Sequence, residues 1–449
     1  MGRLDFDADV IIVGGGPAGS ALGTFLASDG HKVILLEKDI HPREHVGEAL
    51  TPSTNVMFQK LGFLEKMNDA GFVRKMGLAW NGPRTAPWKF LEIRTSDYPF
   101  PGSPQPGSFN VERGEMDTML LRHSFERGVK VLQGVGAQRV LFEDGRAVGV
   151  HVKVADGWER DLRAKYIVDA TGRRCMLANQ LKMRRRDQVM NQYSIWSWFD
   201  GVKALPERIS GFTVFYFVGI PKAWCWHIPL RNDRCSMGVV VDKEQFRESG
   251  KDPEEYFYSL IAKNRTFSDA MENAERVRPW WVEGDYTYSS ERMAGPGWLI
   301  VGDAARFVDP IFSSGVDVAL YSAYYAYEAI TEAWITGDES SAFRDYEKRI
   351  DGGVEVWYRF VNVFYRLQNL FTRFLTSPQW KEETVRALQG NPYDPETRAR
   401  AERIFAAMEE AYSMVMADPT NVLRPWEDLR EFAAIQVSKT IDGAAPVSN

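Results

Sequence analysis

The chain has 449 residues, with 55 basic and 61 acidic side chains and a formal net charge of −6. This length suffices for two or three domains or for one interleaved unit. The mildly acidic balance gives no electrostatic basis for binding nucleic acid or an anionic membrane. No apolar run approaches the roughly 20 residues that cross a bilayer, and the aspartate-rich N-terminus is unlike a secretory signal.

The cysteines and aromatic residues restrict the class of protein further. The three cysteines form no Cys-X-X-Cys pair and indicate no disulfide framework, so we expect a reducing compartment, the cytoplasm. No group of His, Cys, Asp and Glu has the spacing of metal ligands, and we expect no metal site. Aromatic side chains make up 13% of the chain, which is high for an ordinary domain. We expect this surplus to line a cavity.

The N-terminal segment has the pattern of a strand, a glycine-rich turn and a helix. Residues 10–13 form a β-branched apolar run typical of a buried parallel strand. Residues 14–19 then read Gly-Gly-Gly-Pro-Ala-Gly, with Ala18 inside the turn, and a helix of small residues follows at 20–27. In such a turn Gly14 permits the tight bend, Gly16 admits a pyrophosphate, and Gly19 lets the helix pack closely on the strand. The pyrophosphate would lie at the helix N-terminus.

A second predicted strand, 32–36, ends at Glu37 with Lys38 beside it. An acid about 20 residues after the glycines is placed to bind the two ribose hydroxyls, and it argues against a 2′-phosphate. The spacing predicts a dinucleotide site formed by the glycine turn, Glu37 and Lys38. The alternative is an ordinary strand-turn-helix unit.

Two later segments favour FAD over NAD. Residues 166–172 form a strand ending in Asp-Ala-Thr-Gly, and residues 297–305 form one ending in Gly-Asp-Ala-Ala. Together with the glycine turn they resemble the flavin monooxygenase superfamily, in which the aspartate matching Asp303 binds the ribityl chain. In this resemblance Arg113 lies near the flavin, or else it starts a helix and pairs with Asp117. The chain shows no second glycine-rich turn, so a transient nicotinamide or a separate NAD(P)H flavin reductase would supply the electrons.

The pattern changes in the second half of the chain. Between about 186 and 285, β-branched and aromatic runs at 192–199, 212–218 and 235–241 predict an antiparallel substrate sheet inserted into the FAD domain. After about residue 318 the pattern is helical, and apolar residues from Trp357 to Leu375, Leu367 among them, recur at three- and four-residue spacing. They indicate a buried helix face, with a pocket wall or a docking face as alternatives. We predict an α/β fold: a Rossmann-type FAD-binding domain over 1–335, interleaved with this sheet, and a helical C-terminal region over 336–449.

Two short stretches point to the chemistry. Residues 224–229 read Trp-Cys-Trp-His-Ile-Pro, and Lys75 opens the run Lys-Met-Gly-Leu-Ala-Trp. Alone, the lysine is typical of a surface charge, and Trp224 and Trp226 of alternate strand positions. Together they resemble the Trp-X-Trp-X-Ile-Pro signature and the lysine of flavin-dependent halogenases. The resemblance covers nearly the whole chain and is nearest to enzymes acting on phenol or pyrrole rings, often as thioesters on an acyl or peptidyl carrier protein. His227 between them is more typical of a hydrogen-bonding residue than of a base.

This resemblance implies a reaction through a flavin hydroperoxide and hypochlorous acid. Trp224 and Trp226 would keep the substrate from the flavin, so that only the halide reaches it. Lys75 would direct the oxidised chlorine by hydrogen bonding or, with a pKa lowered by burial, as a chloramine. The backbone N–H groups of Ser314 and Gly315 would hold chloride, unless this segment is only a turn and a helix start.

Phe312 stands where tryptophan halogenases carry a glutamate that stabilises the ring cation. We therefore expect an electron-rich phenol or pyrrole rather than an indole. The expected protein is an FADH2-dependent halogenase of specialised, antibiotic-type metabolism, with FAD and chloride as cofactors. The alternatives are an FAD-dependent aromatic hydroxylase, in which Lys75 and the tryptophans only pack, and a flavin-holding protein without turnover.

Overall fold

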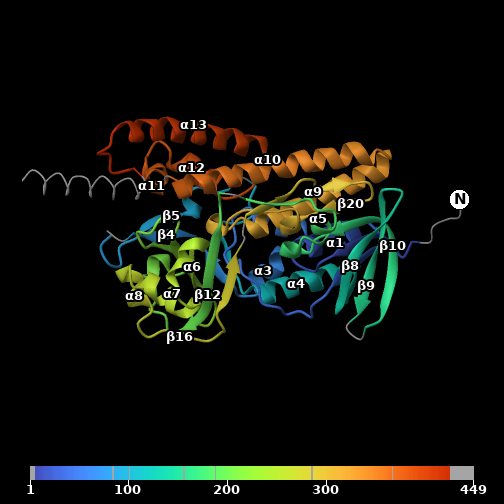
Figure 1. Cartoon of the computed structure of the whole chain (residues 1–449), viewed down its shortest axis with the longest axis horizontal. Coiled ribbons are helices and arrows are strands. Elements are labelled where there is room, and N and C mark those ends of the chain that lie inside the picture. Colours follow the sequence, from blue (N-terminus) through green and yellow to red (C-terminus); the bar gives the residue numbers. More distant parts are fainter. Residues whose placement is uncertain are drawn as a thin grey trace, which may run out of the picture.

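The computed structural model describes residues 6–82, 85–100, 102–154, 157–187, 189–284, 287–366 and 368–424. Two large β-sheets lie side by side in the long direction of the molecule, and a layer of helices runs along both (Figure 1). Within the described residues, no helix is both long and apolar enough to cross a membrane. The same residues include no group of three or more His, Cys, Asp and Glu arranged to hold a metal ion.

The first sheet has eight strands around a parallel core. Its parallel strands follow the order β20-β10-β1-β2-β7, and Val10 of β1 lies between Tyr166 of β10 and Val33 of β2. The apolar run of β1 is buried because helices and strands cover it on all sides. The strands are β1 (Ala8–Val13), β2 (Val33–Glu37), β7 (Lys130–Gln133), β8 (Val135–Glu143), β9 (Arg146–Val154), β10 (Glu159–Asp169), β19 (Ala294–Gly295) and β20 (Trp298–Ile300). Helix α1 (Pro17–Ser28) packs against α4 (Arg113–Glu126) and against α9 (Gly315–Thr336).

The second sheet also has eight strands, in the order β16-β12-β15-β14-β13-β4-β5 with β17 beside β12. Its pairings are antiparallel except β13 with β4, which is parallel. The predicted strands appear as β12, β13 and β15. Strands β4 and β5 precede the predicted insertion in the chain. The sequence did not predict that they belong to this sheet. The strands are β4 (Gly77–Asn81), β5 (Leu91–Arg94), β12 (Gln192–Asp200), β13 (Thr213–Phe217), β14 (Trp224–Pro229), β15 (Cys235–Asp242), β16 (Glu275–Arg276) and β17 (Trp281–Gly284).

One face of the second sheet is covered by three helices that were not predicted. Asp242, Asp252 and Asn264 each accept a backbone N–H at the N-terminus of one of them, which fixes where they begin. The helices are α6 (Lys243–Ser249), α7 (Pro253–Ile261) and α8 (Arg265–Ala270). Side chains on the opposite face of this sheet line the two cavities described below.

Short elements connect the two sheets. Strands β3 (Val73–Lys75) and β6 (Ser108–Asn110) form a two-stranded ribbon in which Lys75 is paired with Ser108. A second ribbon joins β11, β18 and β21. The remaining short elements are α2 (Thr54–Lys60), α3 (Leu64–Asp69), α5 (Met176–Gln180), β11 (Arg184–Arg186), β18 (Tyr288–Ser290) and β21 (Arg306–Phe307).

The helical part of the chain begins with α9 (Gly315–Thr336), close to the change to a helical pattern predicted at about residue 318. It continues with α10 (Glu339–Arg366), α11 (Gln368–Thr376), α12 (Lys381–Ala387) and α13 (Pro395–Ala417). Helix α10 contacts both sheets (Figure 1). Its Tyr346 hydroxyl donates to the Ile300 carbonyl of the first sheet (2.7 Å), and its Phe364 packs on Phe217 of the second sheet. The described residues of the predicted apolar face are buried. Leu367 lies outside the described residues.

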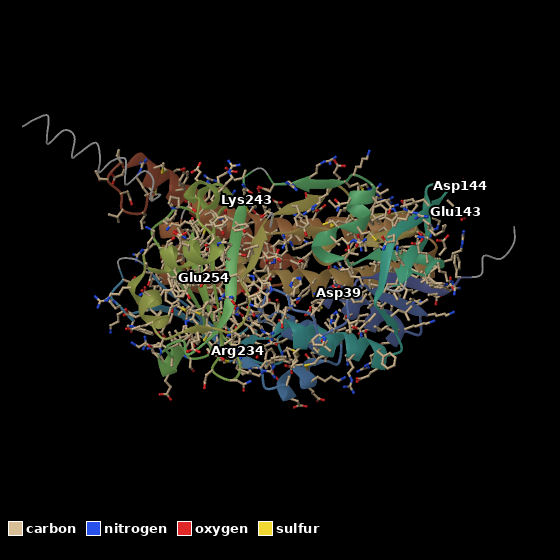
Figure 2. All side chains as sticks on the ribbon, turned by 60° about the horizontal axis from the view of Figure 1, so that its bottom comes forward. Asp39, Glu143, Asp144, Arg234, Lys243 and Glu254 are labelled. Carbon is tan, nitrogen blue, oxygen red and sulfur yellow. The ribbon has the colours of Figure 1, made fainter. Side chains whose placement is uncertain are left out.

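Charged side chains mark the outside of this arrangement. Glu143 and Asp144 lie at the exposed turn between β8 and β9, at one end of the molecule (Figure 2). Glu254 of α7 is exposed on the helices that cover the second sheet (Figure 2). Because ionised groups are costly to bury, the few charges that are buried deserve a functional explanation.

Candidate functional site

A cavity of about 410 Å³ lies where β1, β2 and β10 end and α1 begins. This is the position at which parallel sheets bind dinucleotides. Most of the predicted cofactor, halide and shielding residues meet there. Those lining the cavity are Gly14, Gly16, Ala18, Glu37, Lys38, Arg113, Trp224, Trp226, Asp303 and Gly315. Gly19 and Ser314 lie behind this lining, and Lys75 lines a second cavity.

The glycine turn has the close contacts that its motif requires. Gly14 has φ +115°, and a Cβ there would lie 2.2 Å from the Ala170 carbonyl oxygen. A Cβ at Gly19 would lie 1.9 Å from the Gly14 oxygen, whereas one at Gly16 would meet only the Arg43 side chain, at 3.4 Å. Helix α1 begins after Gly16 without a side-chain cap. Its first N–H groups therefore remain available to a pyrophosphate.

Glu37 ends β2 as a buried carboxylate. Its Oε2 accepts the Gly15 N–H (2.8 Å) and its Oε1 accepts the Asp39 N–H (2.9 Å). Burial raises the pKa of Glu37, but the His41 ring, whose Nε2 lies 3.8 Å from Oε2, and these two N–H groups prevail and lower it to about 2. The group therefore stays ionised at neutral pH, as an acceptor of ribose hydroxyls requires.

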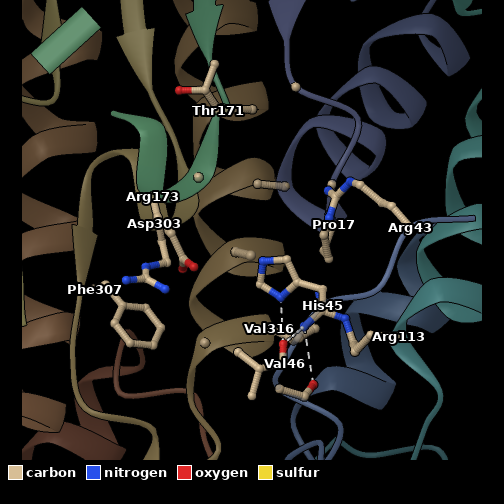
Figure 3. Close-up of a pocket in the computed structure, with 18 of the residues that line it drawn as sticks. Pro17, Arg43, His45, Val46, Arg113, Thr171, Arg173, Asp303, Phe307 and Val316 are labelled. Carbon is tan, nitrogen blue, oxygen red and sulfur yellow. Dashed lines mark hydrogen bonds between the residues drawn. The ribbon is translucent and has the colours of Figure 1, made fainter. Parts of the chain in front are cut away.

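Arg113 takes the helix-start role, one of the two that the sequence left open, and it also lines the cavity. It starts α4 and pairs with Asp117, with Nε 2.8 Å from Oδ1 and Nη2 3.1 Å from Oδ2. Its Nη1 also donates to the Val46 carbonyl (2.8 Å), so the same side chain holds the loop along the cavity. Asp303 lies across the cavity beside Arg173 (Figure 3), and burial raises its pKa to about 6 although both arginines oppose this.

Several polar cavity residues were assigned no role from the sequence, among them Arg43, His45, Glu48 and Arg173. The ring of His45 points into the cavity between Asp303 and Pro17 (Figure 3), and burial lowers its pKa to about 4. Glu48 is buried and accepts the indole N–H of Trp198, and burial raises its pKa to about 8. The signal that could have found three of them is their loop, 43–48, which follows the carboxyl end of β2.

Trp224 and Trp226 belong to the second sheet and line the first cavity. Strand alternation in β14 directs Trp224, Trp226 and Ile228 toward the cavity. Trp226 lies flat over Gly238 of β15, where a Cβ would come within 2.1 Å of the indole. Its N–H donates to the Ser236 hydroxyl (3.1 Å).

His227 points to the opposite face of β14. It hydrogen-bonds to the Cys235 thiol (3.2 Å) and to the Tyr216 hydroxyl (3.3 Å). Burial lowers its pKa to about 3. This confirms the expected hydrogen-bonding role, because the ring is neutral and lies away from both cavities.

A second cavity of about 80 Å³ contains Lys75. Phe215 and Ser313 line both cavities, so at these residues the wall is one side chain thick. Lys75 is 5% exposed, its Nζ donates to the Leu50 carbonyl (2.9 Å), and burial lowers its pKa to about 7. The apolar side chains around it are Leu78, Trp80, Ile93, Phe217, Ile311, Phe312, Phe364, Phe371, Leu375, Val385 and Leu388. The predicted helix face is thus also a cavity wall.

The predicted halide segment joins the two cavities. Ser313 has a left-handed φ of 59°, and Gly315 is the first residue of α9. Ser314, just before the helix, is 2% exposed and makes no side-chain capping hydrogen bond. N–H groups in a first helical turn have no partner four residues earlier. Phe312 packs against Trp357 and Phe371, so its position carries a ring rather than a carboxylate.

This fold and its dinucleotide cavity define an FAD-binding protein. The chain matches the family model described as FAD binding domain over residues 7–349. It is 36% identical over 436 residues to the 1H-pyrrole-2-carbonyl-peptidyl-carrier-protein chlorinase of Pseudomonas fluorescens, covering 93% of this chain and 96% of that protein. It is 31% identical to the corresponding brominase of Pseudoalteromonas luteoviolacea, covering 90% and 97%. The solved flavin-dependent brominase Bmp2 superposes with a TM-score of 0.80 at 29% identity, covering 91% and 99%.

The chain therefore belongs to the flavin-dependent halogenases and is an FAD-dependent enzyme. Of the two activities that the sequence left open, family membership supports halogenation over hydroxylation. The predicted α/β fold with its helical C-terminal region is confirmed, and the second sheet is antiparallel except for the pairing of β13 with β4.

Proposed function

We propose that this halogenase chlorinates a small, electron-rich ring carried as a thioester on a carrier protein, with pyrrole-2-carbonyl as the preferred group and a phenol as the alternative. One observation supports this most strongly. The Lys75 amine lies in a small apolar cavity that is separated from the FAD cavity by a thin wall. A ring in the second cavity does not reach the flavin, whereas a small oxidised halogen has to cross only this wall.

The cavity residues fit the cofactor. Gly14, Gly16, Ala18 and Gly19 would receive the pyrophosphate, together with Arg43, which lies over Gly16. Glu37 and Lys38 would hold the adenosine ribose, and Arg113 and Asp303 would face the flavin end. When bound and reduced, FAD supplies with dioxygen the two-electron oxidation of the halide. The N–H groups of Ser314 and Gly315 would hold chloride next to it, because backbone donors bind an anion without titrating.

Lys75 would control the oxidised chlorine. With a pKa of about 7, the amine and the ammonium are both populated near neutral pH. The ammonium can hydrogen-bond to the oxygen of hypochlorous acid, and it can donate the proton with which that oxygen leaves as water. Since Leu50 O already accepts one of its hydrogens, the direction of the Nζ is fixed.

The second cavity also limits the substrate. Its volume of about 80 Å³ is smaller than the roughly 150 Å³ of a cavity that binds benzene, which favours the smallest aromatic rings. Among the described residues that line it, Lys75 is the only charged one. A free amino acid would bring an ammonium for which no described lining residue supplies a carboxylate, at a cost of several kcal/mol. A neutral acyl ring on a thioester avoids this cost, and two relatives are named for pyrrole-2-carbonyl groups on a peptidyl carrier protein.

Two further parts of the proposal concern partners and location. A separate NAD(P)H flavin reductase would supply reduced flavin, since the sequence shows one glycine-rich dinucleotide turn. We place the enzyme in the cytoplasm, which the three buried, unpaired cysteines support.

The first experiment needs no ring substrate. The purified protein is loaded with reduced FAD, mixed with oxygenated buffer with and without chloride, and assayed for oxidised chlorine with a thiol trap. We expect oxidised chlorine that depends on chloride and persists longer on wild type than on Lys75→Ala. Peroxide alone at every chloride concentration would refute chlorination. Pyrrole-2-carbonyl loaded on a phosphopantetheinylated carrier protein, compared with free pyrrole-2-carboxylate and a free phenol, then tests the substrate by mass spectrometry.

A further inference from the structure

The ring loses a proton when chlorine replaces hydrogen, and the position of Phe312 offers no base for it. We propose that Asp317 accepts this proton, acting through the hydroxyl groups of Ser53 and Thr51. This inference rests on the proposed function, because it assigns a group to the ring-substitution step. Asp317 does not touch the ring and acts only through the two hydroxyls.

The three residues form a continuous path from the second cavity into the protein. Thr51 lines the cavity that holds Lys75, one residue after the Leu50 carbonyl that accepts the Lys75 hydrogen bond. Its Oγ1 lies 3.1 Å from the Ser53 Oγ, and Ser53 donates a short hydrogen bond to the Asp317 carboxylate. Thr51 Oγ1 is also 3.4 Å from the same carboxylate oxygen. A proton therefore has hydroxyl-to-hydroxyl steps at hydrogen-bond distance along the whole path.

Asp317 lies in an unusual environment for a structural carboxylate. It is fully buried in the first turn of α9, and its second oxygen, Oδ2, has no hydrogen-bond partner among the described residues. Its charge contributes to the raised pKa of Tyr321, Tyr325 and Tyr393, and within the described chain the hydroxyls of Tyr321 and Tyr393 also lack partners. The Ser53 hydroxyl already donates to Oδ1, so it can pass its proton to that oxygen and accept a hydrogen bond back from it, and uptake of the proton breaks no existing contact.

The acid strength of the group suits this use. Burial raises the pKa of Asp317 to about 7, and hydrogen bonds from Ser53, Thr51 and the Asn391 backbone limit the rise. A proton acceptor is most effective when its pKa lies near the working pH. Asp317 is then partly ionised at neutral pH, while an ordinary exposed aspartate would be too weak a base.

The proposed step balances atoms and charge. A ring carbon forms a bond to chlorine, and the Cl–O electron pair leaves with oxygen, which takes a proton from the Lys75 ammonium and becomes water. The C–H electron pair restores the aromatic ring, and its proton passes to Thr51 as the Thr51 proton moves to Ser53 and the Ser53 proton moves to Asp317. The step ends with a neutral lysine and a protonated aspartate, and one proton moving from the acid to the amine resets both.

The first test separates proton removal from fold. The holoenzyme is given carrier-bound pyrrole-2-carbonyl with hydrogen or deuterium on the ring, and the two products are compared by mass spectrometry. Thr51→Val and Asp317→Asn keep the shape of the site, so we expect turnover to fall about 10- to 100-fold and discrimination against deuterium to appear. Thr51→Ser retains the hydroxyl and should rescue both readouts. Reduced turnover without deuterium discrimination would overturn the proposal, since a packing defect does not make C–H cleavage limiting.

A second test needs no ring substrate, so its failure is distinct from failure of the proposed function. Infrared difference spectra of the FAD-loaded protein are recorded between pH 5 and 9 for wild type and Asp317→Asn. We expect a carboxylic acid band that titrates near pH 7 in wild type, is absent in Asp317→Asn and shifts in Ser53→Ala. Burial raises the pKa of Asp309 to about 7 as well, so Asp309→Asn is the matched buried-acid control: it should remove the Asp309 component of this absorbance and leave the Asp317 component in place. Absence of a titrating band assigned to Asp317 would overturn the proposal whatever the enzyme halogenates.

Discussion

The indole N–H of Trp224 donates a hydrogen bond to the hydroxyl of Tyr365 across 2.8 Å. That hydroxyl donates in turn to Asp309 Oδ2 (2.9 Å), and the other oxygen of Asp309 accepts the Ile311 N–H (3.0 Å). Strand β14, helix α10 and the segment leading to Gly315 are thus fixed to one another at one point. The C-terminal helical region therefore helps to hold the wall between the two cavities.

Removing the Tyr365 hydroxyl should loosen this wall. In Tyr365→Phe the Trp224 N–H and an Asp309 oxygen lose their partner, and a buried unsatisfied group costs about 1–3 kcal/mol. We expect a fall of this size in the free energy of unfolding, and more hydrogen peroxide per halogenated product. Chemical denaturation and a peroxide assay measure the two effects. Tyr412→Phe on α13 is the matched control, and an unchanged peroxide ratio in Tyr365→Phe would contradict the role of this contact.

A methyl group at Gly238 should displace the second tryptophan. The added Cβ would lie 2.1 Å from the Trp226 ring, so the indole has to leave its position on the sheet. Overpacking of this kind costs about 1–3 kcal/mol, and we expect Gly238→Ala to produce more peroxide and less oxidised chlorine. Gly136→Ala is the control, because the nearest atom to its Cβ is a Gln138 side-chain nitrogen at 3.5 Å. Equal peroxide yields from the two variants would show that the position of Trp226 does not matter.

Two glycines of the first turn should fail in different ways. A Cβ at Gly19 meets the Gly14 carbonyl at 1.9 Å, so Gly19→Ala should lose at least ~3 kcal/mol of stability. Gly16→Ala should fold normally, since its Cβ meets only Arg43, but its FAD affinity should fall about tenfold or more, or roughly 1.4 kcal/mol. Thermal unfolding of the apoprotein and fluorescence titration with FAD separate the two. Normal folding of Gly19→Ala would refute the packing argument.

Burial of Lys75 should make stability depend on pH in a defined direction. Its pKa is about 7 in the folded protein against 10.5 for an ordinary lysine, so between these values the unfolded chain binds more protons and stability rises with pH. Each unit of pKa shift corresponds to about 1.4 kcal/mol. We expect Lys75→Met to be more stable than wild type at pH 7 by several kcal/mol, with the difference shrinking toward pH 10.

Urea denaturation at pH 7 and pH 9.5 tests this dependence on Lys75. Lys130→Met, at an exposed position of β7, is the control for loss of one positive charge. A stability difference between Lys75→Met and wild type that is the same at both pH values would show that the lysine is not buried in its neutral form. Lys75→Met should also retain FAD affinity, because Lys75 lines the second cavity and not the first.

The sequence by itself determined the features that depend on neighbouring residues. The apolar run at 10–13, the glycines after it and the acid at Glu37 specify the FAD site locally, since a tight turn and a close helix require glycine wherever they occur. Trp224 and Trp226 stand at alternate positions of a strand, and strand geometry places both rings on one face. Helix periodicity was sufficient to predict the buried face of α10 and α11.

Only the tertiary structure decided how these pieces meet. Strand β4 pairs with β13, more than a hundred residues later, and that pairing helps to separate the Lys75 cavity from the flavin cavity. Nothing near Tyr365 or Asp317 in sequence indicates that they reach Trp224 and Thr51. The low pKa of the lysine and the high pKa of the aspartate also follow from burial, which depends on every segment packed around a group. Local pattern fixes which side chains share a face, whereas packing between distant segments fixes which of them lose water and gain a partner.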